Sequence, residues 1–472
     1  MDPHPYDVLS YHLQVPREWY EAGRIIPLTH NAFSYFPMGM EMHYLAAMTL
    51  RGGPWAGMYL CQMMTLAHGF LTVLAVGHLA RALGATPIRA WSGSLLVAGV
   101  PWVFQLSVVA YVETGVMLYT TLAVGWLLLG IRTGNIRAWW IVGICCGFAC
   151  GIKYTAIPMT ALLVVMIVLV QESVGRRFAR VMIVLVACVI VASPWLIRNT
   201  VWTGNPVFPL ATNLFGSAHF MQDQVIRYQA AHAPPAEESD LSSRIHNGWS
   251  RTLIDPQFGY VIWIAGMGAV LFLMIRKTPT DGIVLGTMIL GMLVVWIGAT
   301  HIVPRFITPV VPLLGLAVAL VPWPGFAAVG LAGLNLMIGG YLVGGWLVPV
   351  LDLARQGLFR VSTPELLMNE QLESVCRSGK TIALIGDAQA FLYPVDSGRL
   401  IYRTVFDVRI PHGVSLVDGW LGESVDSLRK RGIWVVIHPL ELQRLSRTYR
   451  GLPSPALPFD KPDQGLIILS PE

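Results

Sequence analysis

Ten apolar runs dominate the chain between residues 55 and 350. A helix that crosses a bilayer needs roughly 17–25 predominantly apolar residues. Runs near this length occur at 55–80, 91–110, 113–131, 138–153, 156–171, 181–197, 259–275, 282–300, 307–322 and 326–350. The pattern therefore predicts an α-helical polytopic membrane protein with about ten transmembrane helices, in which a long outer loop at 198–258 separates the sixth run from the seventh.

The head of the chain, residues 1–54, has a different pattern, in which prolines and polar residues alternate with aromatic ones. Proline is favoured at the first position of a helix because its missing N–H is not needed there. Pro5, Pro16 and Pro37 therefore predict three short amphipathic helices, the first with Asp7 in its opening turn. The aromatic residues between them suit the membrane interface, and we expect these helices to lie on the membrane surface.

After residue 350 the apolar stretches shorten to strand length. Four of them, at 381–386, 400–403, 433–438 and 465–470, predict buried β-strands with helical stretches between them. This part of the chain is therefore expected to be a small α/β domain. The predicted domains are 1–54, 55–350 and 351–472.

Composition agrees with a membrane protein. Of the 472 residues, 54% are hydrophobic and 12% are charged, whereas a soluble domain has roughly 25% charged residues. The net charge of +5 is not gathered in a basic stripe with aromatic residues, so membrane lipids are expected partners and nucleic acid is not. Five of the six cysteines, all but Cys376, lie inside apolar runs, and no disulfide framework is predicted.

The distribution of Arg and Lys orients the predicted helices, because cytoplasmic loops carry an excess of both. Four turns are rich in them: Arg81 with Arg89, Arg132 with Arg137, Arg176 with Arg177 and Arg180, and Arg276 with Lys277. With these turns in the cytoplasm, the head 1–54, the loop 198–258 and the domain 351–472 are expected to be extracytoplasmic.

A head on the outer side has to be carried across the membrane. Met1 is followed directly by the polar head, without a signal peptide or an apolar run. Either the first apolar run inserts with its N-terminus translocated, or a further transmembrane helix precedes this chain. We expect the second alternative.

Four charged residues interrupt the apolar runs at the predicted outer face: Glu113, Lys153, Arg198 and Arg305. A charged side chain costs about 2.5–3.5 kcal/mol at the centre of a transmembrane helix and less near the interface. Each of the four therefore faces a wet cavity or a partner, or is only a solvated or snorkelling charge at a helix end. Asp7 has the same two interpretations, because an acid in the first turn also stabilises a helix.

Carboxylates and cations on one face suit the transfer of a group from a lipid-linked phosphate donor. A carboxylate can act as a general base, and cations stabilise the charge that develops on a phosphate leaving group. A transporter or lipid flippase would place its charged residues near mid-bilayer, with access from both sides. That class and a non-catalytic membrane subunit are the alternatives.

At these residues the chain resembles the polytopic GT-C glycosyltransferases, particularly bacterial relatives of protein mannosyltransferases (glycosyltransferase family 39) and of the aminoarabinose transferase acting on lipid A. The resemblance covers roughly residues 1–350. It rests on YDVLSYHL at 6–13 with Pro37 and Glu41, AYVETG at 110–115, GIKYT at 151–155, WLIRN at 195–199, TGNPVFP at 203–209 and PRFITPVVP at 304–312. It implies an inverting transfer of a sugar from a polyprenyl-phosphate donor to a lipid, glycan or protein acceptor, outside the bacterial inner membrane.

The resemblance also implies roles for single residues. Asp7 is expected to be the catalytic base, and Glu113 is expected to shape the acceptor or metal site. Relatives often have two adjacent acids in the first loop, whereas Val8 follows Asp7 here, so Glu41 is the other candidate base. The residues expected to face the donor phosphate are Lys153, Arg198 and Arg305. Further substrate contacts are expected from Tyr11, His12, Tyr154, Asn205 and His301. No cofactor is required for such a donor, although paired acids could hold a divalent metal.

Overall fold

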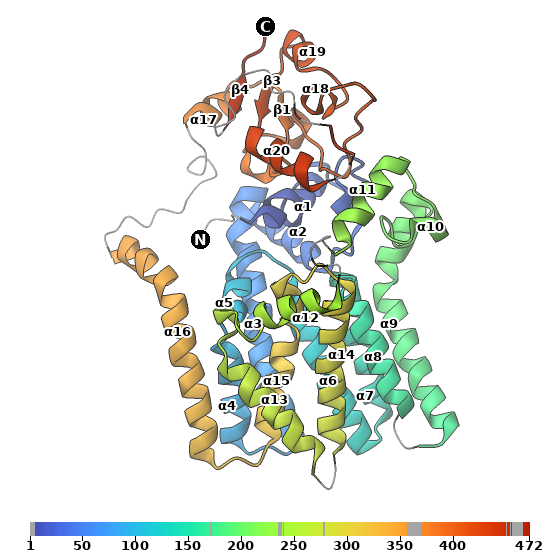
Figure 1. The fold of residues 1–472 in the computed structure, drawn as a ribbon, viewed down its shortest axis with the longest axis vertical. Helices are drawn as coiled ribbons and strands as arrows, with labels where there is room; N and C mark the ends of the chain where they lie inside the picture. The colour runs from blue at the N-terminus through green and yellow to red at the C-terminus, as the bar shows by residue number, and fades with distance from the viewer. Residues whose placement is uncertain are drawn as a thin grey trace.

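The computed structural model describes residues 5–169, 172–234, 238, 240–276, 279–355, 370–449, 451–453, 455 and 466–472. Lys277 of the fourth basic turn and residue 465 of the last predicted strand lie outside these ranges. Figure 1 shows a bundle of long helices, an α/β domain at the opposite end of the molecule, and the head between them.

Each predicted apolar run contains a helix in its described part. The bundle contains α3 (Pro54–Ala82), α4 (Pro87–Ala98), α5 (Pro101–Val108), α6 (Glu113–Thr133), α7 (Ile136–Ile152), α8 (Ala156–Leu169), α9 (Val174–Thr203), α13 (Val261–Met274), α14 (Thr280–Ala299), α15 (Val310–Leu320) and α16 (Gly325–Arg355). Among the described residues, five helices (α3, α6, α9, α14 and α16) are long and apolar enough to cross a membrane, and α4 with α5 is a sixth candidate, bent by 65°. The apolar helices α7, α8, α13 and α15 are shorter. The chain is thus an integral membrane protein, and the count of ten crossings stays a prediction.

The centre of the bundle is α15, all of whose residues are buried. It packs against α3, α4, α13 and α14. The approach of α4 to α15 is close because glycines face each other: a Cβ at Gly93 would lie 2.6 Å from the carbonyl oxygen of Gly315. In helices α9 and α16, in contrast, only 22% and 28% of the apolar stretch is buried, as expected for side chains that face lipid.

The head consists of a π-helix (Val8–His12), α1 (Gln14–Glu21) and α2 (Gly39–Arg51). The predicted start of the second helix at Pro16 is wrong. Helix α1 begins two residues earlier, and Pro16 is tolerated there because the first N–H groups of a helix have no intrahelical partner. The apolar faces of these helices are buried inside the protein, as Val8 and Trp19 show.

The C-terminal region is a small α/β domain with a four-stranded sheet in the order β2-β1-β3-β4. Strand β1 (Ile382–Ile385) pairs in parallel with β2 (Leu400–Ile401) and β3 (Trp434–Ile437), and β4 (Ile467–Leu469) pairs with β3 in the antiparallel direction. The four predicted strands are confirmed. The helices of this domain are α17 (Glu370–Arg377), α18 (Leu416–Gly419), α19 (Val425–Lys430) and α20 (Pro439–Thr448).

The α/β domain lies on the head (Figure 1), and hydrogen bonds join these two parts, which are far apart in the chain. The guanidinium of Arg17 is completely buried and donates to the carbonyl oxygens of Ala390 and Val395. The backbone N–H of Thr404 donates to the carbonyl oxygen of His30 at 3.1 Å. These groups are satisfied only when the two parts are together, so head and domain form one unit.

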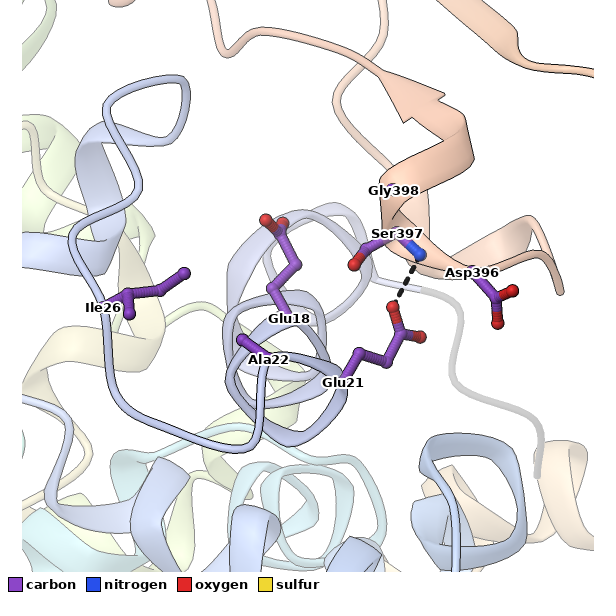
Figure 2. Close-up of a pocket in the computed structure, with 7 residues that line it drawn as sticks. All are labelled: Glu18, Glu21, Ala22, Ile26, Asp396, Ser397 and Gly398. Atoms are coloured by element: carbon purple, nitrogen blue, oxygen red, sulfur yellow. Dashed lines mark hydrogen bonds between the residues drawn. The ribbon is translucent and has the colours of Figure 1, made fainter.

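A hollow of about 370 Å³ lies at the edge of this contact. Figure 2 shows Glu21 accepting a hydrogen bond from the backbone N–H of Ser397, at 2.5 Å. The neighbouring Glu18 accepts hydrogen bonds from Gln14 and Tyr402 and pairs with His30. Since both carboxylates already have protein partners, they join α1 to the α/β domain.

The long loop after α9 is largely helical where the structure describes it, with α10 (Thr212–Phe215), α11 (Gln222–His232) and α12 (Leu241–Ser250). Helix α11 also contacts the α/β domain. The buried Arg227 of α11 donates to the carbonyl oxygens of Val405 and Val408, at 2.9 and 3.1 Å. The head, this loop and the domain therefore enclose a common space above the bundle.

Candidate active site

A cavity of about 540 Å³ occupies the space where the head, the bundle, α11 and the α/β domain meet. Most of the residues predicted for the site line it: Asp7, Tyr11, His12, Glu41, Lys153, Tyr154, His301 and Arg305. Their segments are separated by up to hundreds of residues in sequence, and the fold brings them to one place. The prediction that the intramembrane charges share one end of the bundle is therefore consistent with a single site.

Arg305 is the centre of the charged network. It lies in a short 3₁₀ helix (Pro304–Ile307) between α14 and α15. Its Nη2 forms an ion pair with the carboxylate of Asp7, and its Nη1 donates to the hydroxyl of Tyr111 at 2.9 Å. Its Nε lies 3.2 Å from Oε1 of Glu113. The guanidinium also stacks over the Tyr111 ring, 4.6 Å from its centroid, so its position and plane are fixed on several sides.

Glu113 joins Arg305 to Lys153. It is the first residue of α6, where the helix dipole favours a negative charge. Its Oε1 accepts a hydrogen bond from Nζ of Lys153 at 2.8 Å, and Nζ lies 3.9 Å from the centroid of the Phe306 ring. The other oxygen, Oε2, is buried without a hydrogen-bond partner among the described residues. One carboxylate thus holds two cations in the cavity wall.

His12 and Glu41 form a second buried pair, with Nδ1 of His12 2.6 Å from Oε1 of Glu41. Because an ionised carboxylate only accepts, Nδ1 carries the proton in this contact. The imidazole ring is further held by Tyr11, at a centroid distance of 4.2 Å. It is part of the π-helix, a rare local geometry that is frequent at functional sites.

His301 occupies the loop between α14 and the Arg305 turn, and its ring meets that of His232 edge to face at 6.2 Å. Burial, together with His232 and Arg305, lowers the pKa of His301 to about 4. Its ring is therefore neutral near pH 7 and can only exchange hydrogen bonds with a substrate. Tyr154, also in the cavity wall, has a buried hydroxyl without a hydrogen-bond partner in the described part of the chain.

Three predicted residues do not line the cavity: Glu113, which binds the lining residues Lys153 and Arg305, and also Arg198 and Asn205. Arg198 lies between the rings of Trp195 and Trp202, each 5.0 Å away, and donates to the carbonyl oxygen of Phe36 at 2.8 Å. It joins α9 to the head. The fully buried Asn205 donates to the carbonyl oxygens of Leu210 and Gly216 at 2.8 and 3.0 Å. It holds the turn that follows α9, which the Asn-Pro pattern does predict.

The sequence alone does not single out Tyr111, which binds the lining residue Arg305, or several residues that line the cavity themselves. Tyr111 precedes Glu113 by two residues, and its position in the same motif is a signal that could have found it. The contributions of α11 and the α/β domain carry no such signal: Tyr228, His232, Thr404, Val405, Phe406, Arg444, Leu445 and Tyr449. They reach the cavity only because the domain docks on the head.

The residues present do not suit a divalent metal. In the part of the chain that the structure describes, no group of three or more His, Cys, Asp and Glu side chains is arranged to hold one. Asp7 and Glu113 are instead bound by cations, which would repel a metal ion added at the same oxygens. The chemistry proposed for this site therefore involves no metal ion.

The structure is similar to solved glycosyltransferase structures. ArnT from Cupriavidus metallidurans bound to undecaprenyl phosphate has a TM-score of 0.61 and 14% sequence identity, over 96% of this chain and 91% of that chain. The oligosaccharyltransferase of Archaeoglobus fulgidus in the apo form has a TM-score of 0.54 and 11% identity, over 94% of this chain and 67% of that chain. Both belong to the GT-C superfamily. The chain thus has the GT-C fold that its motifs predict.

A third similar structure is the oligosaccharyltransferase AglB from Archaeoglobus fulgidus, in complex with an inhibitory peptide and a dolichol-phosphate. Its TM-score is 0.51 and its identity 12%, over 93% of this chain and 66% of that chain. A family model described as a domain of unknown function (DUF8201) matches residues 63–311. No curated protein matches the sequence.

Proposed function

The chain belongs to the DUF8201 family, and we propose that it is a membrane glycosyltransferase that moves a sugar from a polyprenyl-phosphate donor to an acceptor. The observation that carries the proposal is a charged network in which Asp7, Arg305 and Lys153 line one cavity at the end of a membrane bundle and Glu113 joins the two cations. A base and cations are the groups that this reaction needs. The solved relatives with the same fold support it, since one is bound to undecaprenyl phosphate and another to dolichol-phosphate.

Arg305 and Lys153 bind the donor phosphate in this proposal. A planar guanidinium grips two phosphate oxygens with parallel hydrogen bonds, and an ammonium adds a compact charge. Both cations lie near Phe306, which lines the same cavity. As the bond between the sugar and the phosphate breaks, negative charge grows on the leaving phosphate, and the two cations stabilise it. Arg198 has no part in this step, because its guanidinium donates a hydrogen bond to the carbonyl oxygen of Phe36.

Asp7 is the catalytic base. The O–H or N–H bond of the acceptor breaks, and its proton goes to the carboxylate of Asp7. The acceptor atom forms a bond to the anomeric carbon while the carbon–oxygen bond to the phosphate breaks, and the lipid phosphate leaves with the electron pair. Attack from the face opposite the phosphate inverts the configuration. Asp7 is freed for this task when the donor phosphate replaces it at Arg305.

The cavity is proposed to open on the extracytoplasmic side of a bacterial inner membrane. The head and the α/β domain lie on the same side, because they are hydrogen-bonded to each other, so an even number of crossings separates them. Ten crossings satisfy this condition. The basic turns at Arg132 and Arg176 lie at the opposite end of the bundle from Glu113 and Arg305, as the positive-inside rule requires for an outer site.

The α/β domain is proposed to select the acceptor. It supplies Phe406 and Tyr449 to the cavity wall, on the side opposite the membrane bundle. An acceptor that enters from outside has to pass these residues before it reaches Asp7. Whether the acceptor is a lipid, a glycan or a protein is therefore decided by the shape of this wall.

A transporter or flippase is less consistent with the structure, because the charged network lies at one end of the bundle and not at its middle. The experiment that tests the proposal is native mass spectrometry of the purified protein, followed by incubation with a labelled polyprenyl-phosphate sugar. We expect the wild type to retain the donor and to release polyprenyl phosphate when a membrane extract supplies acceptors. Arg305→Ala should lose the donor. Asp7→Asn should retain the donor without turnover. An Asp7→Asn variant as active as the wild type would mean that Asp7 is not the base, and a wild type without turnover would indicate a non-catalytic subunit.

A further inference from the structure

Helix α12, in the loop between α9 and α13, has three distinct faces. Leu241, Ile245 and Trp249 follow one another at four-residue spacing and are 67%, 54% and 56% exposed. A spacing of four places them in one stripe along the helix. The next face around the helix is polar and exposed, with His246 and Ser250. An exposed apolar stripe beside an exposed polar face is the pattern of a helix that lies in a membrane interface.

The third face of α12 packs on the end of α14. Arg244 is buried, and its guanidinium donates to the carbonyl oxygens of Ile297 and Thr300 at 2.5 and 2.6 Å. These carbonyls belong to the last turn of α14 and to the residue that follows it, where no intrahelical donor is available. The contact is close because a Cβ at Gly248 would lie 2.9 Å from side-chain atoms of Ile297. Helix α12 is therefore fixed at the point where a candidate membrane span ends.

We propose that α12 is an in-plane membrane helix whose apolar stripe is inserted into the lipid leaflet around the end of α14. The depth of α12 in the membrane agrees with this proposal, because α12 lies at the end of a candidate membrane span and a span ends where the hydrocarbon core meets the headgroups. Figure 1 shows α12 running crosswise to the long helices near that end of the bundle. The residue types fit as well, because tryptophan favours the interface and the aliphatic side chains suit the acyl region. Phospholipid, and not a protein partner, is thus the occupant of the stripe.

The inserted helix also sets the depth of the cavity. Thr300 accepts a hydrogen bond from Arg244, and both Thr300 and the adjacent His301 line the cavity. Four residues further on is Arg305, the proposed phosphate ligand. Resting on the proposed function, this means that α12 holds the phosphate-binding residues at the level where the phosphate of a membrane lipid lies.

Spin labels on α12 test the insertion. Ile245→Cys and His246→Cys are adjacent and both exposed, but one belongs to the apolar stripe and the other to the polar face. The labelled full-length proteins are placed in phosphatidylcholine nanodiscs, and the parent protein, whose own cysteines are buried or half-buried, is labelled in parallel as background. Collision with oxygen reports lipid exposure, and collision with a water-soluble nickel chelate reports water exposure.

We expect the label at Ile245 to collide mainly with oxygen and the label at His246 mainly with the nickel chelate. Equal access of the chelate to both labels would overturn the insertion, and so would a label at Ile245 that neither reagent reaches, because a protein would then cover the stripe. Neither result depends on sugar transfer.

The depth-setting step, in which α12 fixes the level of the cavity in the membrane, has its own test. The measured quantity is the affinity for polyprenyl phosphate. Ile245→Asp should weaken binding by several-fold, whereas the matched His246→Asp should not. Equal affinities of both variants and the wild type, with the label at Ile245 still in lipid, would overturn the depth-setting step alone. A wild type that binds no polyprenyl phosphate would instead contradict the proposed function and leave the insertion result standing.

Discussion

Asp7 and Arg305, 298 residues apart in sequence, form an ion pair in the wall of the cavity. The remaining contacts of the guanidinium are with Tyr111 and Glu113. The guanidinium of Arg305 is therefore already engaged by the protein itself. The proposed base and the proposed phosphate ligand neutralise each other until a donor arrives.

This pairing predicts that Asp7→Asn binds polyprenyl phosphate more tightly than the wild type. The phosphate competes with the Asp7 carboxylate for Arg305, and a neutral amide competes less. We expect the dissociation constant to fall by about tenfold, which corresponds to roughly 1.4 kcal/mol, while sugar transfer is lost. Binding is measured by native mass spectrometry titration, and transfer by the release of labelled sugar.

Glu41→Gln is the matched control for this variant. Glu41 lines the same cavity, but its contact is with His12 and not with Arg305. Its dissociation constant for polyprenyl phosphate should equal that of the wild type. If Asp7→Asn also leaves the constant unchanged, Asp7 and the phosphate do not compete.

A second prediction concerns the shape of the cation. Arg305→Lys keeps the charge but cannot form two parallel hydrogen bonds to a phosphate. A hydrogen bond to a charged group contributes about 1.5–3 kcal/mol, so we expect donor affinity to fall by about ten- to a hundredfold. Arg198→Lys is the control, because Arg198 lies outside the cavity wall and should change donor affinity much less. A similar loss in both variants would show that overall charge, and not the geometry of Arg305, determines binding.

A third prediction concerns the contact between the head and the α/β domain. Arg17→Met leaves the carbonyl oxygens of Ala390 and Val395 without their donor in a buried contact. Removing one partner from a buried charged network costs about 3–5 kcal/mol. We expect a lower melting temperature and faster proteolysis of the α/β domain.

The exposed Arg409 provides the control, since it donates to a backbone carbonyl, that of His219, without being buried. Arg409→Met should leave both melting and proteolysis near the wild-type values. Equal proteolysis of the Arg17 and Arg409 variants would mean that Arg17 does not hold the domain.

A fourth prediction is a dependence of stability on pH. Burial raises the pKa of Asp407 to about 6, from an ordinary value of about 3.9. The folded protein therefore binds a proton more tightly than the unfolded chain. The stabilisation that results is complete below about pH 3.9 and is lost as the pH rises through about 6. A shift of about two units corresponds to about 3 kcal/mol.

Asp407→Asn should remove this part of the pH dependence, because the amide does not titrate. The melting temperatures of the variant and the wild type are compared between pH 4 and pH 7, and their difference should change in favour of the variant as the pH rises. Asp396→Asn, at an exposed position of the same domain, is the control and should follow the wild type. Parallel curves for all three proteins would show that Asp407 does not titrate in this range.

Much of the fold could be predicted from hydrophobic periodicity. The apolar runs became helices, and the four short runs after residue 350 became strands, because burial of apolar side chains determines both patterns. The start of α1 was misplaced because proline is compatible with several positions of a first turn, and the pattern cannot distinguish them. The place of the α/β domain could not be predicted, since it depends on single contacts such as that of Arg17 with Val395.

The candidate site could be predicted where ionisable residues interrupt apolar runs. An ionisable residue such as Glu113 or Lys153 within an apolar run requires a partner, and the structure supplies it. Arg198 shows the limit of that reasoning, because its partners are two tryptophan rings, the Asn199 side chain and a backbone carbonyl. Phe406 shows the opposite case: an aromatic residue in an ordinary α/β domain becomes part of the cavity only through docking.

The docking of the α/β domain on the head also determines when the cavity becomes complete during synthesis of the protein. The head and the membrane helices leave the ribosome first, and the cavity then lacks the wall that contains Phe406 and Tyr449. Strand β4, which completes the sheet of that domain, is made last. A nascent chain whose translation stops before β4 thus carries an open, unfinished cavity, and on the proposed function it is not expected to transfer a sugar.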